Sequence, residues 1–206
     1  MKKPLITTAA ALSAALLLSA CSTSSGGSGG DMAGMPGHST PASSAPAPST
    51  GDPAGDGHNA ADTMFAAMMI PHHRQALEMS GIVLEKPGIP ADVTALARRI
   101  QQAQGPEIAT LTSWLGAWGE KQSDHGGHSM DGMMSAEDLE QLKSAQGTAA
   151  ARLFLTQMIK HHEGALAMAR TESRDGKDVK AVELSRKIVA DQAAEIAEMK
   201  KLLAGL

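Results

Sequence analysis

Residues 64–79 read MFAAMMIPHHRQALEM, and residues 154–168 read FLTQMIKHHEGALAM. The second stretch repeats the first at a constant offset of 89 residues and keeps the paired histidines between methionines. The matching residues are Phe65, Met69, Ile70, His72, His73, Ala76, Leu77 and Met79, which recur as Phe154, Met158, Ile159, His161, His162, Ala165, Leu166 and Met168. Such a repeat predicts that one structural unit occurs twice in the chain.

Both copies have the periodicity of an amphipathic helix, because their apolar residues and histidines recur at spacings of three, four and seven. The first helix is expected to begin near Asp62 as its N-cap, and the third to cover about 148–171. A second helix is predicted over about 91–118, and its pattern returns at an offset of 88 in a fourth helix over about 178–203. The repeated unit is therefore a helical hairpin.

The two hairpins, residues 60–118 and 148–206, are joined by a crossover over residues 119–147, which contains a short helix preceded by a capping signal at Ser135. Two amphipathic hairpins with a long connection are typical of an all-α, ferritin-like four-helix bundle. The composition agrees with this fold. The chain has 13 Met but no Tyr, two Phe and two Trp, which favours helices over sheets.

The N-terminus has the features of an exported lipoprotein. Two lysines, an apolar run over residues 5–20 and the sequence Leu-Ser-Ala-Cys predict a signal peptide over residues 1–20 and lipidation of Cys21. The alternative is an ordinary secretory signal with an incidental cysteine. We expect the protein to be exported and lipid-anchored to the outer side of the bacterial cell membrane. Because Cys21 is the only cysteine, no internal disulfide can form.

Residues 21–59 are rich in Ser, Gly, Pro and Ala and predict a disordered tether, because they hold too few large apolar side chains to form a core. Within the tether, Met32, Met35 and His38 lie close together in the sequence and form either a metal-binding motif or low-complexity drift. The formal net charge of the whole chain is −4, and removal of the signal peptide makes it about −6. This charge argues against a nucleic-acid partner.

A cluster of polar residues is predicted on the apolar faces of the four helices. His72, His73, His161 and His162 come from the first and third helices, and the second and fourth carry Gln104, Glu107, Gln192 and Glu195 as two Gln-x-x-Glu motifs. Two interpretations remain open. The glutamates accept hydrogen bonds from the imidazoles and fix the helix register, or the cluster binds a metal. The pattern departs from the Glu and Glu-x-x-His ligands of di-iron bundles.

The methionines favour copper, since thioether sulfur selects Cu(I) and imidazole suits copper as well. For the helical methionines Met69, Met79, Met158 and Met168, the alternative is adaptable core filling. That alternative is weaker in the Gly-rich segments. The candidate metal ligands there are Met32, Met35 and His38 in the tether and His125, His128, Met130, Met133 and Met134 in the crossover.

The doubled M-x-x-HH-x-x-A-x-x-M element, with Q-x-x-E-I after each copy, resembles the bacterial domain-of-unknown-function 305 family, which includes CopM-type copper-binding proteins. The resemblance covers about residues 60–206. It implies a ferritin-like bundle, extracytoplasmic placement and, for some members, Cu(I) binding in copper tolerance. The residues that match its motif are Met69, His72, His73, Met79, Met158, His161, His162 and Met168.

The sequence therefore predicts a non-catalytic, lipid-anchored protein that sequesters Cu(I) or hands it over, with Gln104, Glu107, Gln192 and Glu195 supporting the ligands. A copper donor or acceptor protein and a second copy of the chain are partners that this role leaves open. The main alternative is a structural or partner-binding bundle. A metal-dependent oxidoreductase is a third, for which the sequence offers no nucleophile or cofactor motif.

Overall fold

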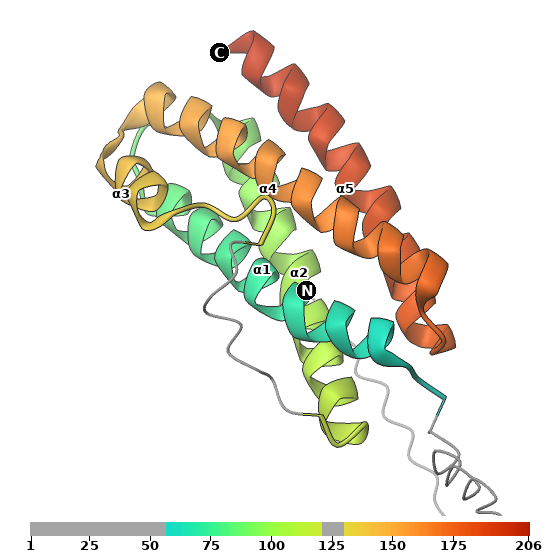
Figure 1. The fold of residues 1–206 in the computed structure, drawn as a ribbon. Coiled ribbons are helices and arrows are strands. Elements are labelled where there is room, and N and C mark those ends of the chain that lie inside the picture. Colours follow the sequence, from blue (N-terminus) through green and yellow to red (C-terminus); the bar gives the residue numbers. More distant parts are fainter. Residues whose placement is uncertain (1–56, 121–129) are drawn as a thin grey trace, which may run out of the picture. The chain divides into compact units, whose positions relative to one another are not determined.

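A computed structural model of the chain describes residues 57–120 and 130–206. This part contains five helices and no strand. The helices are α1 (Ala60–Leu84), α2 (Ala91–Ala117), α3 (Ala136–Ser144), α4 (Gly147–Asp175) and α5 (Val179–Gly205) (Figure 1). The predicted all-α bundle is confirmed. No described helix is both long and apolar enough to span a membrane. The predicted signal peptide, Cys21 and residues 22–56 lie outside the described residues.

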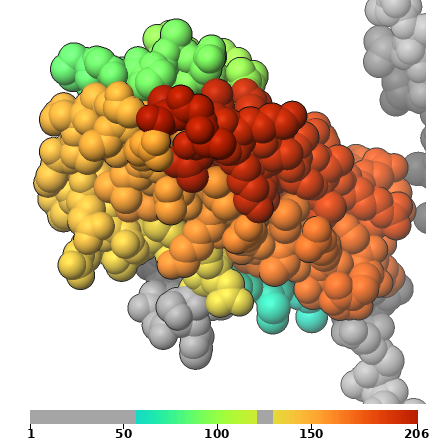
Figure 2. All heavy atoms as spheres, turned by 90° about the horizontal axis from the view of Figure 1, so that it is seen from above, coloured from blue at the N-terminus to red at the C-terminus, as the bar shows by residue number. Residues whose placement is uncertain are grey.

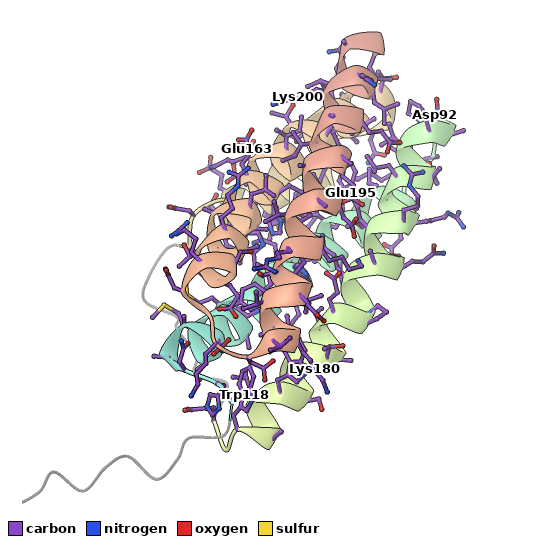
Figure 3. The ribbon with its side chains drawn as sticks, turned by 90° about the vertical axis from the view of Figure 1, so that its right-hand side faces the viewer. Asp92, Trp118, Glu163, Lys180, Glu195 and Lys200 are labelled. Carbon is purple, nitrogen blue, oxygen red and sulfur yellow. The ribbon has the colours of Figure 1, made fainter. Side chains whose placement is uncertain are left out.

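The four long helices form two antiparallel hairpins, α1 with α2 and α4 with α5, and the hairpins pack together mainly through α1 and α4. Figure 3 shows Asp92 and Lys200 at one end of the bundle and Trp118 and Lys180 at the other, so α2 and α5 run in opposite directions. Figure 2 shows a face formed by α4 and α5, with residues 130–144 beside α4.

Helix α1 begins at Ala60, three residues before the start that an N-cap at Asp62 predicts. Asn59, not Asp62, is the N-cap, and Asp62 is the third helical residue, whose carboxylate accepts the backbone N–H of Asn59 in a capping box. The expectation that Asp62 caps the helix was therefore wrong. The Asp62 carboxylate also accepts the backbone N–H groups of Lys177 and Asp178. It thereby ties the start of α1 to the turn between α4 and α5.

The core consists of two apolar clusters. One contains the last turns of α1, the start of α2 and the first half of α4, with Val83, Leu96 and Phe154 among its residues. The other contains the start of α1 and the end of α2, with Phe65 and Leu111. The predicted polar residues occupy the helical turns between these clusters. We call them the polar layer, and they are His72, His73, Gln104, Glu107, His161, His162, Gln192 and Glu195.

The crossover is held against α1 and α4 by specific contacts. The side-chain amide of Gln75 donates to the carbonyl of Met134 over 2.9 Å and accepts its N–H over 2.7 Å. Gly164 in α4 lets the crossover approach closely, since a Cβ atom there would lie 2.0 Å from the carbonyl oxygen of Asp131. Gly132 beside it has a φ of 85°, which favours glycine. These contacts place Met130 to Met134 next to the hairpin interface.

Candidate metal centre

The polar layer combines two imidazole–carboxylate pairs with a central imidazole pair. In the first hairpin, Nε2 of His73 lies 2.9 Å from Oε2 of Glu107. In the second, Nε2 of His162 lies 2.7 Å from Oε2 of Glu195. Both glutamates therefore hold the second histidine of the pair in their own hairpin. These hydrogen bonds match the first of the two interpretations that the sequence left open, in which the glutamates accept from the imidazoles.

The first histidine of each pair lies between the hairpins. The rings of His72 and His161 have centroids 3.8 Å apart and planes inclined by 39°. Their side chains are 0% and 1% exposed, and none of their four ring nitrogens has a hydrogen-bond partner of normal geometry. A buried nitrogen without a partner destabilises a fold by about 1–3 kcal/mol. The central imidazole pair therefore lacks the well-formed hydrogen bonds that usually accompany a buried histidine.

Burial also keeps these two imidazoles uncharged. Loss of solvation, with repulsion from His73 and His162, lowers the pKa of His72 to about 3, although the Asp131 backbone opposes this shift. Burial, followed by the neighbouring histidines with His72 foremost, holds the pKa of His161 well below its usual value. Both rings are neutral at physiological pH, so each carries a nitrogen lone pair that can bind a metal ion.

The two glutamines extend the set of unpaired groups. Both amide atoms of Gln104 and the amide oxygen of Gln192 are buried without a hydrogen-bond partner. Native proteins leave few such groups unpaired, and an ion or water commonly accounts for the exceptions. The polar layer therefore resembles a binding site more than a completed hydrogen-bond network.

Four of the seven predicted sulfur ligands in the described part of the chain lie away from solvent. Met69, Met79 and Met158 are fully buried in the apolar clusters, and Met134 is 6% exposed. Met130, Met133 and Met168 are partly exposed. The buried methionines therefore suit core filling, whereas the partly exposed ones are accessible to an ion from solvent. The predicted ligands Met32, Met35, His38, His125 and His128 lie outside the described residues.

A cavity of about 440 Å³ lies between the first half of α1 and the second half of α4. Met64, Met68 and Met168 all line it, together with Phe65 and Glu172. Met64 and Met68 were not among the predicted ligands. Their spacing of four residues was the available signal, because it places both thioethers on one side of a helix.

Two carboxyl groups lie at the cavity end of the bundle. Burial, together with the nearby Asp62 carboxylate, raises the pKa of Glu172 to about 8. Burial acts to raise the pKa of Asp62 as well, but the neighbouring Glu172 side chain and hydrogen bonds from three backbone N–H groups lower it overall. At neutral pH, Glu172 is therefore a protonated acid next to the Asp62 carboxylate.

The described residues contain no group of three or more His, Cys, Asp or Glu side chains that could hold a metal ion. A hard-metal centre with several carboxylates does not fit this part of the chain. A soft ion needs fewer donors of this kind, because imidazole and thioether satisfy it. The two donor sets that the fold supplies are the central imidazole pair and the methionines of the cavity.

Solved structures of similar chains are available for comparison. A secreted protein from Streptomyces coelicolor, described as DUF305, is 31% identical, with a TM-score of 0.67, and the match covers 70% of this chain and 93% of that one. A DUF305 fragment from Deinococcus radiodurans is 30% identical over 73% of this chain and 100% of the fragment, with a TM-score of 0.67.

CopM has been solved in a Cu(I)-bound form, which is 30% identical over 70% of this chain and 96% of its own length, with a TM-score of 0.59. It has also been solved in Cu(II)-bound and Ag-bound forms. No curated protein matches the chain. The family described as "Domain of unknown function (DUF305)" matches residues 62–203, which include all of α2 and α4, nearly all of α1 and α5, and the whole polar layer. The chain therefore belongs to the DUF305 family.

Proposed function

We propose that this protein binds Cu(I) and that His72 and His161 are its central ligands. The observation that carries the proposal is the pair of neutral, buried imidazoles whose ring nitrogens have no hydrogen-bond partner. Their proximity lets both rings contact one ion after small rotations. A bound ion would satisfy nitrogens that otherwise destabilise the core.

Neutral imidazoles also suit copper uptake across a wide pH range. An ordinary histidine ligand must lose a proton before it binds a metal, so its affinity falls below a pH of about 6.5. The lowered pKa values of His72 and His161 remove this competition. His73 and His162 then act as positioning residues, since the glutamates fix both the rings and the helix turns that carry the central pair.

The likeness to CopM supports the choice of metal. Structures of CopM with Cu(I), Cu(II) and silver are similar to this chain at about 30% identity. Imidazole and thioether donors suit Cu(I) and Ag(I) better than they suit hard cations. We infer that the protein is non-catalytic and sequesters copper or hands it to another protein outside the cytoplasm, anchored through a lipid on Cys21.

A second candidate is a structural bundle in which the polar layer only fixes helix register. The two His–Glu hydrogen bonds favour it, because they satisfy one nitrogen of His73 and one of His162 without any ligand. This explanation does not extend to His72 and His161, which have no such partners. The two candidates therefore differ in what they expect of the central pair.

The test compares two double variants of the full chain. His72→Leu/His161→Leu removes the unpaired nitrogens, so we expect it to abolish central copper uptake while the metal-free protein keeps or gains stability. His73→Leu/His162→Leu is the matched control, and we expect it to lose stability by about 2 kcal/mol because Glu107 and Glu195 lose their imidazole partners.

The measurements are anaerobic Cu(I) titration against a chromophoric chelator and urea unfolding of the metal-free forms. Unchanged uptake by His72→Leu/His161→Leu contradicts the ligand assignment. A clear loss of metal-free stability in that variant, with no Cu(I) uptake by the wild type, supports the structural candidate instead.

A further inference from the structure

The cavity between α1 and α4 contains three methionines whose exposure core filling does not explain. Met64 is 60% exposed and is one of two large hydrophobic residues that are exposed in the described part of the chain. Met68 and Met168 are partly exposed on the same cavity wall. Exposed thioether side chains contribute little to stability, so their gathering around one cavity requires another reason.

The two copies of the repeat show that these methionines are not a by-product of duplication. The residues at the positions of Met64 and Met68 in the second copy are Leu153 and Gln157. Met79, which occupies the position of Met168 in the first copy, is fully buried. The three methionines therefore line one cavity because of where the hairpins pack, and the second copy has no corresponding set of methionines.

In both helices, the cavity methionines lie on the same side as the central imidazoles, one or two helical turns apart. In α1, Met64, Met68 and His72 follow at intervals of four residues, which is a rise of about 6 Å each. In α4, Met168 lies seven residues after His161, or two helical turns on the same side. Because the rings of His72 and His161 lie against each other at a tilt while α1 and α4 run antiparallel, Met168 lies across from the Met64 to Met68 turn.

We propose that Met64, Met68 and Met168 form a separate, exchangeable site for a soft monovalent cation, Cu(I) or Ag(I), through which the ion reaches His72 and His161. Three thioethers from two helices can converge because methionine has three rotatable bonds. Thioether sulfur selects soft ions, and the open cavity permits exchange. The route to the histidines depends on the proposed function, whereas ion binding at the three methionines does not.

The test uses the full chain with Met64→Leu/Met68→Leu/Met168→Leu, since leucine keeps the volume and removes the sulfur. The control is Met69→Leu/Met79→Leu/Met158→Leu, which removes the same number of sulfurs from the core. Circular dichroism verifies the fold of both. We expect the cavity variant to bind about one fewer Cu(I) or Ag(I) per chain, to lose sulfur scattering in the copper X-ray absorption spectrum and to load the histidines about tenfold more slowly.

Unchanged stoichiometry and sulfur scattering in the cavity variant overturn the proposal. Equal losses in the cavity and core variants overturn it too, because they assign no special role to the cavity. His72→Leu/His161→Leu separates this result from the proposed function. Sulfur-ligated ion that persists in that variant supports the methionine site, and complete loss of binding there overturns it as a separate site.

Discussion

The two hairpins share one repeated sequence, yet corresponding residues make different contacts in the two copies. The polar layer is alike in both, since His73 with Glu107 and His162 with Glu195 repeat the same hydrogen bond. Outside that layer the copies diverge. Gln75 of the first copy holds the crossover through its amide, and the corresponding residue of the second copy is Gly164, which gives the crossover room.

This difference separates what the repeat must keep from what it can change. The pairs in the polar layer depend on contacts within a hairpin, so each copy preserves them by itself. Residues 131–134 of the crossover contact Gln75 in one copy and Gly164 in the other. Gln75 and Gly164 are therefore adapted to one asymmetric segment, and so are the methionines at the cavity.

The largest expected effect comes from breaking the shared pairs one at a time. Glu107→Leu leaves Nε2 of His73 without an acceptor in a fully buried position, and we expect the free energy of unfolding to fall by about 3 kcal/mol. Glu195→Leu should lower it by about 1.5 kcal/mol, because the Glu195 side chain is 18% exposed against 11% for Glu107. Urea unfolding of the metal-free variants measures both values. Equal losses would contradict the difference in burial.

The next effect concerns the asymmetric glycine. Gly164→Ala places a methyl group 2.0 Å from the Asp131 carbonyl oxygen, so either the crossover or α4 must shift. We expect a loss of about 2 kcal/mol in the free energy of unfolding. Gly105→Ala in α2 is the control, since its new Cβ meets no atom within 4 Å. That control should gain about 0.5–1 kcal/mol from helix propensity. A neutral Gly164→Ala would show that the close approach is not required.

Much of this arrangement follows from local patterns in the sequence. The helices, the hairpins and the burial of Gln104 and Gln192 follow from periodicity, because a helix face depends only on residue spacing. Helical periodicity alone does not show which histidine of a pair bonds to the glutamate. His72 and His73 are about 100° apart on either side of one helix face, and the packing of α1 against α4 determines which of them faces the glutamate.

The cavity and the crossover contacts depend on tertiary packing, and sequence spacing did not reveal them. The sequence shows that Gln75 of the first copy is replaced by Gly164 in the second. The roles of these two residues, however, depend on the path of the crossover. Met64 and Met68 have ordinary helical spacing and become a candidate site only when Met168 arrives from another helix. Long-range contacts of this kind are not encoded in any single helix pattern.

A third prediction concerns Asp62 and Glu172, the two carboxyl groups where the start of α1 meets the end of α4. The second hairpin has no such pair at its own start. Glu172 titrates near 4.5 when unfolded and near 8 when folded, so the folded state binds more protons between these values. The free energy of unfolding should therefore decrease as the pH rises from about 4.5 to 8 and level off above 8. Screening beside the cavity limits the change from this group to about 1.5 kcal/mol.

Glu172→Gln tests this directly, because an amide keeps the size of the acid but does not ionise. We expect the variant to lose the decrease between pH 5 and 9 and to be more stable than the wild type at pH 9, with Glu163→Gln as an exposed control on the same helix. If the free energy of unfolding changed with pH in the same way in the wild type and in Glu172→Gln, the titration of Glu172 would be ruled out as the cause.

The smallest effect again separates the hairpins. Lys187 of α5 donates to Glu107 over 3.2 Å and so reinforces the first His–Glu pair from the opposite hairpin. Its counterpart in the repeat, Arg99, pairs with Glu198 instead of with Glu195. Lys187→Ala should lower the free energy of unfolding by about 0.5 kcal/mol, since the ammonium is 57% exposed. The loss should disappear in 1 M salt, where surface charges are screened. A salt-independent loss would mean that the lysine stem packs on α2, and the two pairs would then differ by burial alone.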